Sequence, residues 1–192
     1  MVADGGVLLY EDEAVFQQSG TISRTWGPVG KGVEVASEPC RRSEKAFGAV
    51  NVTNPDTPKF HFMFAAVFNA ITFMLFLKQL LRAYPTRVIH LILDNVRYHH
   101  AKLVQEWLLS DGLTDRIKFH FLPPYSPDFN AVEDVWRVSK RKSTHNKHFP
   151  EKPALRHALF RCFNRFQGNP ASLRSTVRRF ALKSPDSNEA CT

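Results

Sequence analysis

The sequence predicts an α/β protein whose mixed sheet is flanked by helices, and three observations support this class. Short β-prone segments fill the first third of the chain, helical periodicity begins near Val67, and apolar strand-like segments then alternate with helical ones. The length of 192 residues suits one large domain with a short appendage. We therefore expect a sheet domain over residues 1–150 and a basic helical extension over residues 151–192.

The first third of the chain is predicted to form a meander of strands. Val7 to Glu11 (VLLYE) is apolar and β-prone, which predicts the first strand. Further short strands are expected over residues 33–36, 47–52 and 59–65, and a turn rich in Asn, Asp and Pro over residues 54–58 precedes the last of them.

The second part of the chain alternates helices and strands. Apolar residues spaced by three and four predict a helix from about Val67 that Tyr84 and Pro85 end. Arg87 to Leu93 (RVIHLIL) is apolar on both alternating faces, which predicts a strand covered on both sides and close to the centre of the sheet. The remaining expected elements are a helix over 100–110, a strand over 117–122, a proline loop over 123–127, a helix from about Asn130 to Lys142, and helices over 153–166 and 170–182, with frayed residues 184–192.

Charge is unevenly distributed and favours a polyanionic partner. The chain has 26 Lys and Arg against 18 Asp and Glu, a net charge of +8. Residues 137–183 hold 13 of the basic residues and a single acid, Glu151, so this stretch carries +12 and the remainder is net acidic. The positive field therefore lies on one side, close to the helix that begins at Asn130.

Secreted and membrane classes are disfavoured. The three cysteines are far apart and form no CxxC pair, which indicates neither a disulfide framework nor a zinc site. No basic stretch followed by a long apolar run opens the chain. The most apolar stretch, Phe62 to Leu77, has 16 residues and includes Asn69 and Thr72, whereas a spanning helix needs about 20 apolar residues. We expect it to be core, and we expect a cytoplasmic protein.

Three acids stand at positions where they can meet. Asp12 ends the first predicted strand, Asp94 ends the strand over 87–93, and Glu133 lies early in the helix after the proline loop. Ends of neighbouring strands converge in an open sheet. Three carboxylates at one place repel one another unless cations bind, and oxygen ligands of this kind suit Mg²⁺ or Mn²⁺.

Each acid also has a structural interpretation. Asp12 is one member of a run of three acids that could simply be solvated, and Asp94 could cap the next helix or shape a turn with Asn95. Glu133 stands at a capping-box distance from Asn130 and could pair with Arg137 one turn on. Trp136 is expected in the core, and the pair His99 and His100 could be structural or contact phosphate.

The motifs YEDEAVF, RTWGPVG, LILDNVRYHHAK and FLPPYSPDFNAVEDVW follow one another in the chain. Together they resemble the catalytic domain of DDE transposases of the mariner superfamily, specifically its bacterial insertion-sequence branch, over roughly Val7 to Leu173. The resemblance implies a ribonuclease H-like fold for residues 1–150, with Asp12, Asp94 and Glu133 holding two Mg²⁺ ions, for which Mn²⁺ substitutes. Ala131 and Val132 replace the Pro and Ile of the family's Asn-Pro-Ile-Glu motif, which removes no ligand but leaves the first helical turn less constrained.

The activity that the resemblance implies is metal-dependent cleavage of double-stranded DNA at insertion-sequence ends, followed by strand transfer into target DNA. It also implies a homodimer that brings two ends together, work at the bacterial nucleoid, and no membrane partner. Because Met1 stands almost at the first catalytic strand, we expect the family's helix-turn-helix reader to be encoded separately or lost.

Basic side chains near the acids are the candidate DNA contacts. Arg97 follows Asp94, and Lys140, Arg141 and Lys142 extend from the helix of Glu133, although such a charge run can also be a merely solvated face. Two other functions remain open at this point. One is a decayed or domesticated DNA-binding module that keeps the fold, and the other is a different ribonuclease H-like nuclease that acts on hybrids or branched DNA.

Overall fold

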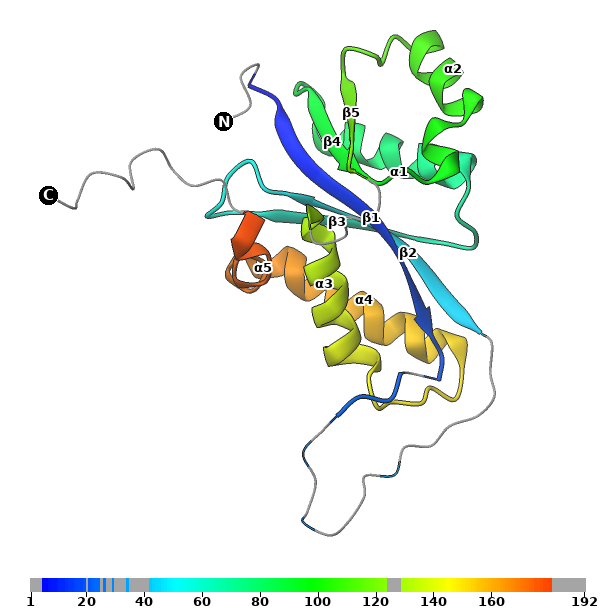
Figure 1. Ribbon diagram of the computed structural model, residues 1–192, viewed down its shortest axis with the longest axis vertical. Helices are drawn as coiled ribbons and strands as arrows, with labels where there is room; N and C mark the ends of the chain where they lie inside the picture. Colours follow the sequence, from blue (N-terminus) through cyan, green and yellow to red (C-terminus); the bar gives the residue numbers. More distant parts are fainter. Residues whose placement is uncertain are drawn as a thin grey trace, which may run out of the picture.

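A computed structural model describes residues 5–19, 21–24, 26, 29, 34, 42–123 and 129–180, and its centre is a five-stranded mixed sheet (Figure 1). The strands are β1 (Val7–Gln17), β2 (Ser43–Asn51), β3 (Lys59–Ala65), β4 (Ile89–Leu93) and β5 (Ile117–Phe121). Their order is β3-β2-β1-β4-β5. The first three pair antiparallel, whereas β4 pairs parallel with both β1 and β5. The predicted α/β class with a mixed sheet is confirmed.

Strand β1 is longer than the sequence predicted. It continues past Glu11 to Gln17, because Glu11 is fully buried and the acids after it stay in the ladder with β2. Asp12 therefore lies inside β1 and not at its end. The strand expected over residues 33–36 falls, apart from the single position 34, outside the described residues.

Strand β4 departs in part from its prediction. It lies inside the sheet between β1 and β5, but β1 occupies the middle position. Its two faces also differ: Ile89, Leu91 and Leu93 are fully buried, whereas His90 and Ile92 are only half-buried. The prediction of a strand covered on both sides therefore holds for one face, while the face of His90 and Ile92 is only partly covered.

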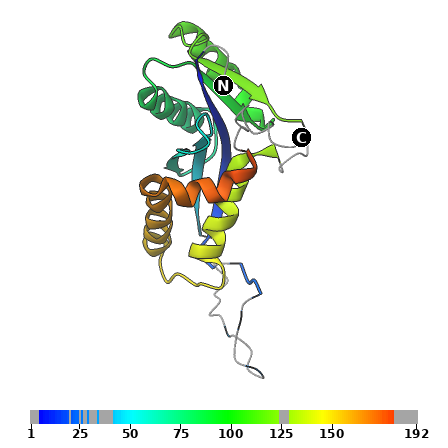
Figure 2. The ribbon, with the colours of Figure 1, turned by 90° about the vertical axis from the view of Figure 1, so that its left-hand side faces the viewer.

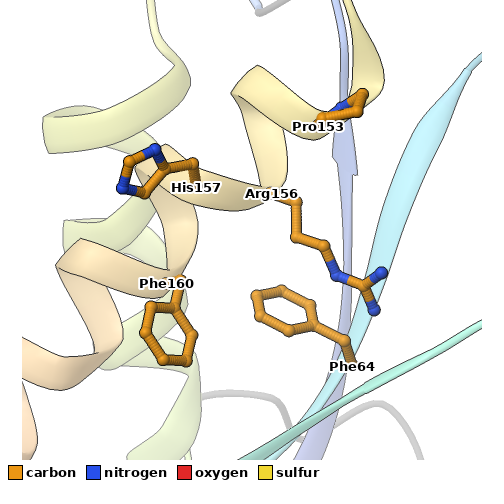
Figure 3. Close-up of a pocket in the computed structure, with 5 residues that line it drawn as sticks. All are labelled: Phe64, Pro153, Arg156, His157 and Phe160. Carbon is orange, nitrogen blue, oxygen red and sulfur yellow. The ribbon is translucent and has the colours of Figure 1, made fainter.

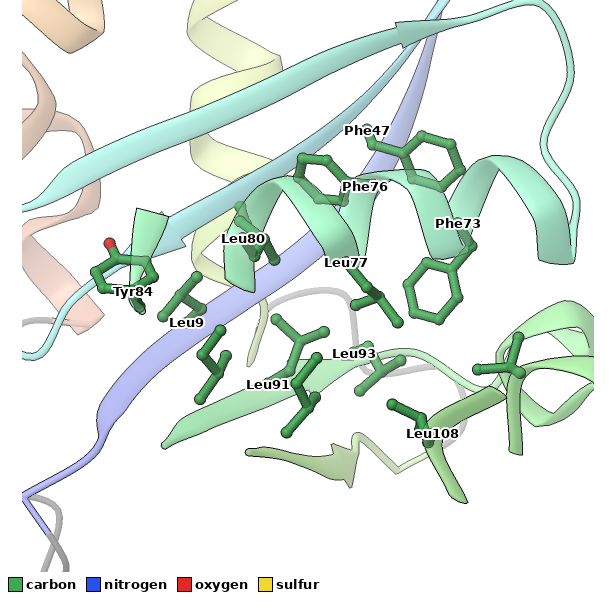
Figure 4. Close-up of a cluster of buried hydrophobic side chains, with 14 of the residues drawn as sticks. Leu9, Phe47, Phe73, Phe76, Leu77, Leu80, Tyr84, Leu91, Leu93 and Leu108 are labelled. Carbon is green, nitrogen blue, oxygen red and sulfur yellow. The ribbon is translucent and has the colours of Figure 1, made fainter. Parts of the chain in front are cut away.

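Helices α1 (Ala70–Ala83) and α2 (Lys102–Ser110) cover one face of the sheet. Asn69 begins α1 through a reciprocal capping box with Thr72. The buried face of α1 packs its Phe and Leu side chains onto β1, β2 and β4 (Figure 4). The stretch from Phe62 to Leu77 thus contains the last part of edge strand β3 and the first part of helix α1. Within the described residues, no helix is both long and apolar enough to cross a bilayer.

Helices α3 (Ala131–Ser139), α4 (Lys152–Gly168) and α5 (Pro170–Val177) cover the opposite face of β1, β2 and β3. In two views turned by 90° these three helices gather in one half of the molecule, with α1 and α2 in the other (Figures 1 and 2). A single π-helical turn, Lys140–Thr144, extends α3, and a 3₁₀ turn, Arg178–Phe180, follows α5. The end of the last predicted helix, beyond residue 180, lies outside the described residues.

Trp136 fixes the position of α3 on the sheet. It is almost fully buried, as predicted, and its ring packs edge-on against Phe16 and Phe60. Gly48 of β2 makes room for this ring, since a Cβ there would lie 2.5 Å from two of its atoms. Gly48 is also the register partner of Asp12 in β1. The contact therefore joins the helix of Glu133 to the strand of Asp12.

Candidate active site

Asp12 and Asp94 meet where β4 ends. The parallel ladder between β1 and β4 runs as far as Tyr10 and Ile92, two residues before each acid. Strand β1 continues beyond this point, while Asp94 follows the last residue of β4. One oxygen each from Asp12, Glu13 and Asp94 lies within 4.8 Å of the others. The end of β4 and the middle of β1 thus bring together two of the three predicted acids, with Glu13 as a third.

Asn130 attaches the start of α3 to the same part of β1. Its side-chain oxygen accepts a hydrogen bond from the backbone N–H of Val132 at 3.1 Å, and its side-chain amide donates to the carbonyl oxygen of Glu11 at 2.7 Å. Both groups are buried. Asn130 therefore caps the helix and ties it to the residue before Asp12.

Glu133 acts electrostatically on Asp12. Burial is the largest cause that raises the pKa of Asp12 well above its usual range, and the negative charge of Glu133 is the next, followed by that of Glu13. The Oδ2 atom of Asp12 is buried and has no hydrogen-bond partner among the described residues. The interpretation of Asp12 as part of a solvated acidic run is wrong. Glu133 stands outside the group of oxygens within 4.8 Å, yet it belongs to the same electrostatic cluster.

Asp94 is the exposed member of the cluster, with 46% of its side chain accessible. Its Oδ1 accepts a hydrogen bond from the N–H of Val96 at 3.1 Å, so it does shape the turn, as the structural interpretation expected. A hydrogen bond with His99 lowers the pKa of Asp94. Asp94 is therefore ionised, and one of its carboxylate oxygens lies close to oxygens of Asp12 and Glu13.

His99 is fully buried and lies next to the carboxylates. Its Nε2 lies 3.2 Å from Glu13 Oε1, and its Nδ1 lies 3.1 Å from the carbonyl oxygen of Asp94. Burial alone would lower the pKa of His99, but hydrogen bonds with Asp94 and Glu13, together with the charges of Glu11 and Glu13, raise it to about 10. Tyr98 also donates a hydrogen bond to Glu13. This network offsets part of the negative charge at the site.

The sequence signal for this network was incomplete. The structural interpretation given to the pair His99 and His100 fits His99, which is fully buried, whereas His100 is exposed and stacks on Phe121. Glu13 was not predicted as a site residue. The only signal for it was its place next to Asp12, because its partners Tyr98 and His99 are 85 and 86 positions away along the chain.

A family model for the DDE superfamily endonucleases matches residues 7–156. The chain belongs to this family. The match covers more than half of the chain and every predicted acid. A comparison with curated proteins found no match.

Solved structures place the fold of this DDE endonuclease. The Mos1 mariner paired-end complex with Mn has a TM-score of 0.57 at 15% identity, covering 91% of this chain and 52% of that one. The catalytic domain of Mos1 mariner transposase has a TM-score of 0.51 at 12% identity, covering 91% and 76%. A simian T-cell lymphotropic virus intasome has a TM-score of 0.52 at 15% identity, covering 80% and 46%. The fold is ribonuclease H-like, and the chain spans about half the length of the first matched transposase chain.

The alternative partner predicted for Glu133 is engaged elsewhere. Arg137 donates to Asp134 Oδ1 at 2.7 Å, and Arg179 donates to the other carboxylate oxygen of Asp134 at 2.8 Å. These bonds join α3 to the turn after α5. The predicted pair between Glu133 and Arg137 is therefore replaced by one with Asp134. A full capping box is also absent from the described contacts, since the side chain of Asn130 bonds to Val132.

The basic residues predicted as DNA contacts lie in two places, one just after Asp94 and the other beyond the C-terminal end of α3. Arg97 is exposed in the 3₁₀ turn Arg97–His100, three residues after Asp94. Arg141 and Lys142 are exposed and Lys140 is half-buried in the π-helical turn. At 1.5 Å per residue, seven residues of helix separate Lys140 from Glu133 by about 10 Å.

The residues present fit a divalent cation. The cluster offers hard oxygen ligands, one of them a buried carboxylate oxygen without a partner. Mutual repulsion and burial raise the pKa of Asp12, and a bound cation would relieve both costs. Asp12, Asp94 and Glu133 are the ligands predicted from the sequence, and Glu13 is an additional one within reach.

Proposed function

We propose that this DDE endonuclease is the catalytic part of a transposase that cleaves DNA at the ends of an insertion sequence and joins it to target DNA. The observation that carries this proposal is the close approach of Asp12, Glu13 and Asp94, with an unpartnered oxygen of Asp12 buried where the charge of Glu133 also acts on it. Such an arrangement is costly to the fold unless it serves a cation.

Asp12, Asp94 and Glu133 would hold two Mg²⁺ ions, for which Mn²⁺ substitutes. Bound ions of this kind supply Lewis acidity toward the phosphodiester and a nucleophile at neutral pH. The chain's own residues hold the acids in place: Asn130 fixes the start of α3 against β1, and His99 orients Asp94 and Glu13. No carboxylate acts as a covalent nucleophile.

The partner in this proposal is double-stranded DNA. Arg97, Lys140, Arg141 and Lys142 would contact backbone phosphates, so that their removal weakens binding about equally for all sequences. The matched Mos1 structures include paired-end complexes, which supports a homodimer holding two DNA ends. We assign the protein to the bacterial nucleoid, in the cytoplasm.

The test is to incubate the purified chain with supercoiled plasmid and Mn²⁺. We expect nicked and linear products from the unchanged chain and none from Asp94→Asn, whereas Asp115→Asn, which alters an exposed acid of the loop before β5, should nick at the original rate. A plasmid that stays supercoiled would contradict the proposal and favour a decayed DNA-binding module. Preferential cleavage of RNA in hybrids would instead favour another ribonuclease H-like nuclease.

A further inference from the structure

A slot between β3 and α4 lies apart from the carboxylate cluster. Its volume is about 450 Å³, and it is lined by Phe64, Pro153, Arg156, His157 and Phe160 (Figure 3). This volume lies within the range of small-molecule sites. Phe64 pairs with Ala46, which pairs with Ala14 of β1, so the slot stands two strands, or about 10 Å, from the strand of Asp12.

One aromatic ring of the slot, that of Phe160, is not buried in the hydrophobic core. The buried face of α4 consists of Leu155, Leu159, Phe163 and Phe166, whereas Phe160 is 48% exposed. The guanidinium of Arg156 lies 5.0 Å from the ring centre of Phe64, where it covers one face of that ring. Exposed Phe160 thus leaves a free apolar surface next to a cation.

The solvent side of α4 is basic. His157, Arg161 and Arg165 repeat at intervals of four residues and are exposed, so they form one stripe along the helix. Among the described residues, no ion pair holds Arg161 or Arg165, while Arg156 lies 3.9 Å from the buried carboxylate of Glu44. The stripe therefore offers its charge to an external anion.

Two other occupants fit the slot poorly. A peptide strand adding to the edge of β3 would need its free carbonyl groups, but those of Phe60 and Phe62 already accept hydrogen bonds from Gln167 and Gln79. A second copy of the chain, placed face to face, would bring two basic stripes together and repel itself.

We infer that this slot binds an unpaired segment of DNA, with one base against Phe160 and its flanking phosphates on Arg161 and Arg165. Proteins bind single-stranded nucleic acids with exposed aromatic rings beside basic side chains, because bases stack on the rings and the charged phosphates contact the basic groups. The inference rests on the proposed function, since cleavage of the two DNA strands at offset positions would leave short unpaired ends.

The test measures the binding of a fluorescent oligo(dT) to the full chain by anisotropy, in EDTA so that no cleavage occurs. Phe160→Ala should weaken binding about 5- to 150-fold, because stacking contributes about 1–3 kcal/mol per base. Phe160→Trp, which keeps an aromatic ring at this position, should bind oligo(dT) as tightly as the unchanged chain. Arg161→Gln should weaken binding and make it less sensitive to salt. Leu109→Ala, at a 69% exposed position of α2, is the matched control and should leave affinity unchanged.

Three results would overturn the inference: oligo(dT) binding that survives Phe160→Ala, an equal loss in the Leu109 control, or an equal loss of duplex binding, which would indicate a plain phosphate surface. Plasmid nicking with Mn²⁺ is followed in parallel, and the control Leu109→Ala should nick at the original rate. If the unchanged chain fails to nick, the proposed function is wrong whatever the binding data show. If it nicks but oligo(dT) binding ignores Phe160, only the slot is wrong.

Discussion

Replacing Gly48 by Ala should disturb the junction between Trp136 and the strand of Asp12. The added Cβ would lie 2.5 Å from both Cη2 and Cζ2 of Trp136 and 3.1 Å from Phe60. Carbon atoms in contact normally stand about 3.5–4.0 Å apart, so the indole ring must move by about 1 Å. Overpacking of this kind costs about 1–3 kcal/mol of the free energy of unfolding. In a chain of this size that lowers Tm by about 2–10 °C.

The same change should reduce catalysis more than stability alone explains. Trp136 is one turn from Glu133 on α3, so a displaced ring carries the carboxylate with it. A misplacement of about 1 Å can cost about 100-fold in rate. Urea denaturation and the rate of plasmid nicking with Mn²⁺ measure the two effects on the same preparation.

Two variants decide whether the clash is the cause. Gly168 is the last residue of α4, and a Cβ added there would meet nothing within 4 Å. Gly168→Ala should therefore leave the stability unchanged or raise it slightly. Trp136→Phe removes the clashing atoms and should recover stability in the Gly48→Ala background, a coupling that a double-mutant cycle detects. The reasoning is refuted if Gly48→Ala unfolds at the original urea concentration, or if the two changes are simply additive.

Two further predictions concern the α3 tether and a buried histidine. Asn130→Ala should lower the free energy of unfolding by about 1–3 kcal/mol and remove most of the nicking activity, because it removes both a helix cap and a buried hydrogen bond to the carbonyl of Glu11. The control Asn169→Ala removes only the cap of α5, so it should lower the free energy of unfolding by about 1 kcal/mol and leave the activity unchanged. Burial, together with the charge of Lys59, lowers the pKa of His61 to about 4 in the folded chain. Below pH 6.5 the unfolded chain therefore binds a proton at His61 that the folded chain does not. The free energy of unfolding should fall by at most about 3 kcal/mol as the pH drops from about 6.5 toward 4. Urea midpoints across this range should fall less steeply for His61→Gln, and parallel curves would contradict the assignment.

The order of elements was predictable because apolar periodicity survives in most of them. Helix α1, strand β5 and helix α4 were expected close to their observed bounds. The extent of β1 was not, because Glu11, Asp12 and Glu13 interrupt the apolar pattern with charges that ordinarily mark a loop. Their burial becomes understandable only when Asn130 and His99 are brought to them from distant parts of the chain.

The three acids of the candidate site were predictable from their motifs, but the supporting residues were not. Parallel pairing of two apolar strands can be expected from the sequence, and this pairing brings Asp12, two residues after Tyr10, near Asp94, two residues after Ile92. Nothing local in the sequence says that Glu13 points away from α3 toward Tyr98, or that one of two adjacent histidines is buried as a cation while the other stacks on the surface. Such pairings depend on three-dimensional packing.

The most direct measurement of the central claim is a calorimetric titration with Mn²⁺ of the unchanged chain and of Asp12→Asn, Asp94→Asn and Glu133→Gln. We expect two ions to bind the unchanged chain and each substitution to abolish at least one. In metal-free buffer, Asp12→Asn should also raise Tm, because it removes a buried charge that its neighbours repel. Unaltered Mn²⁺ binding by all three variants, or a lower metal-free Tm for Asp12→Asn, would contradict a shared cation site.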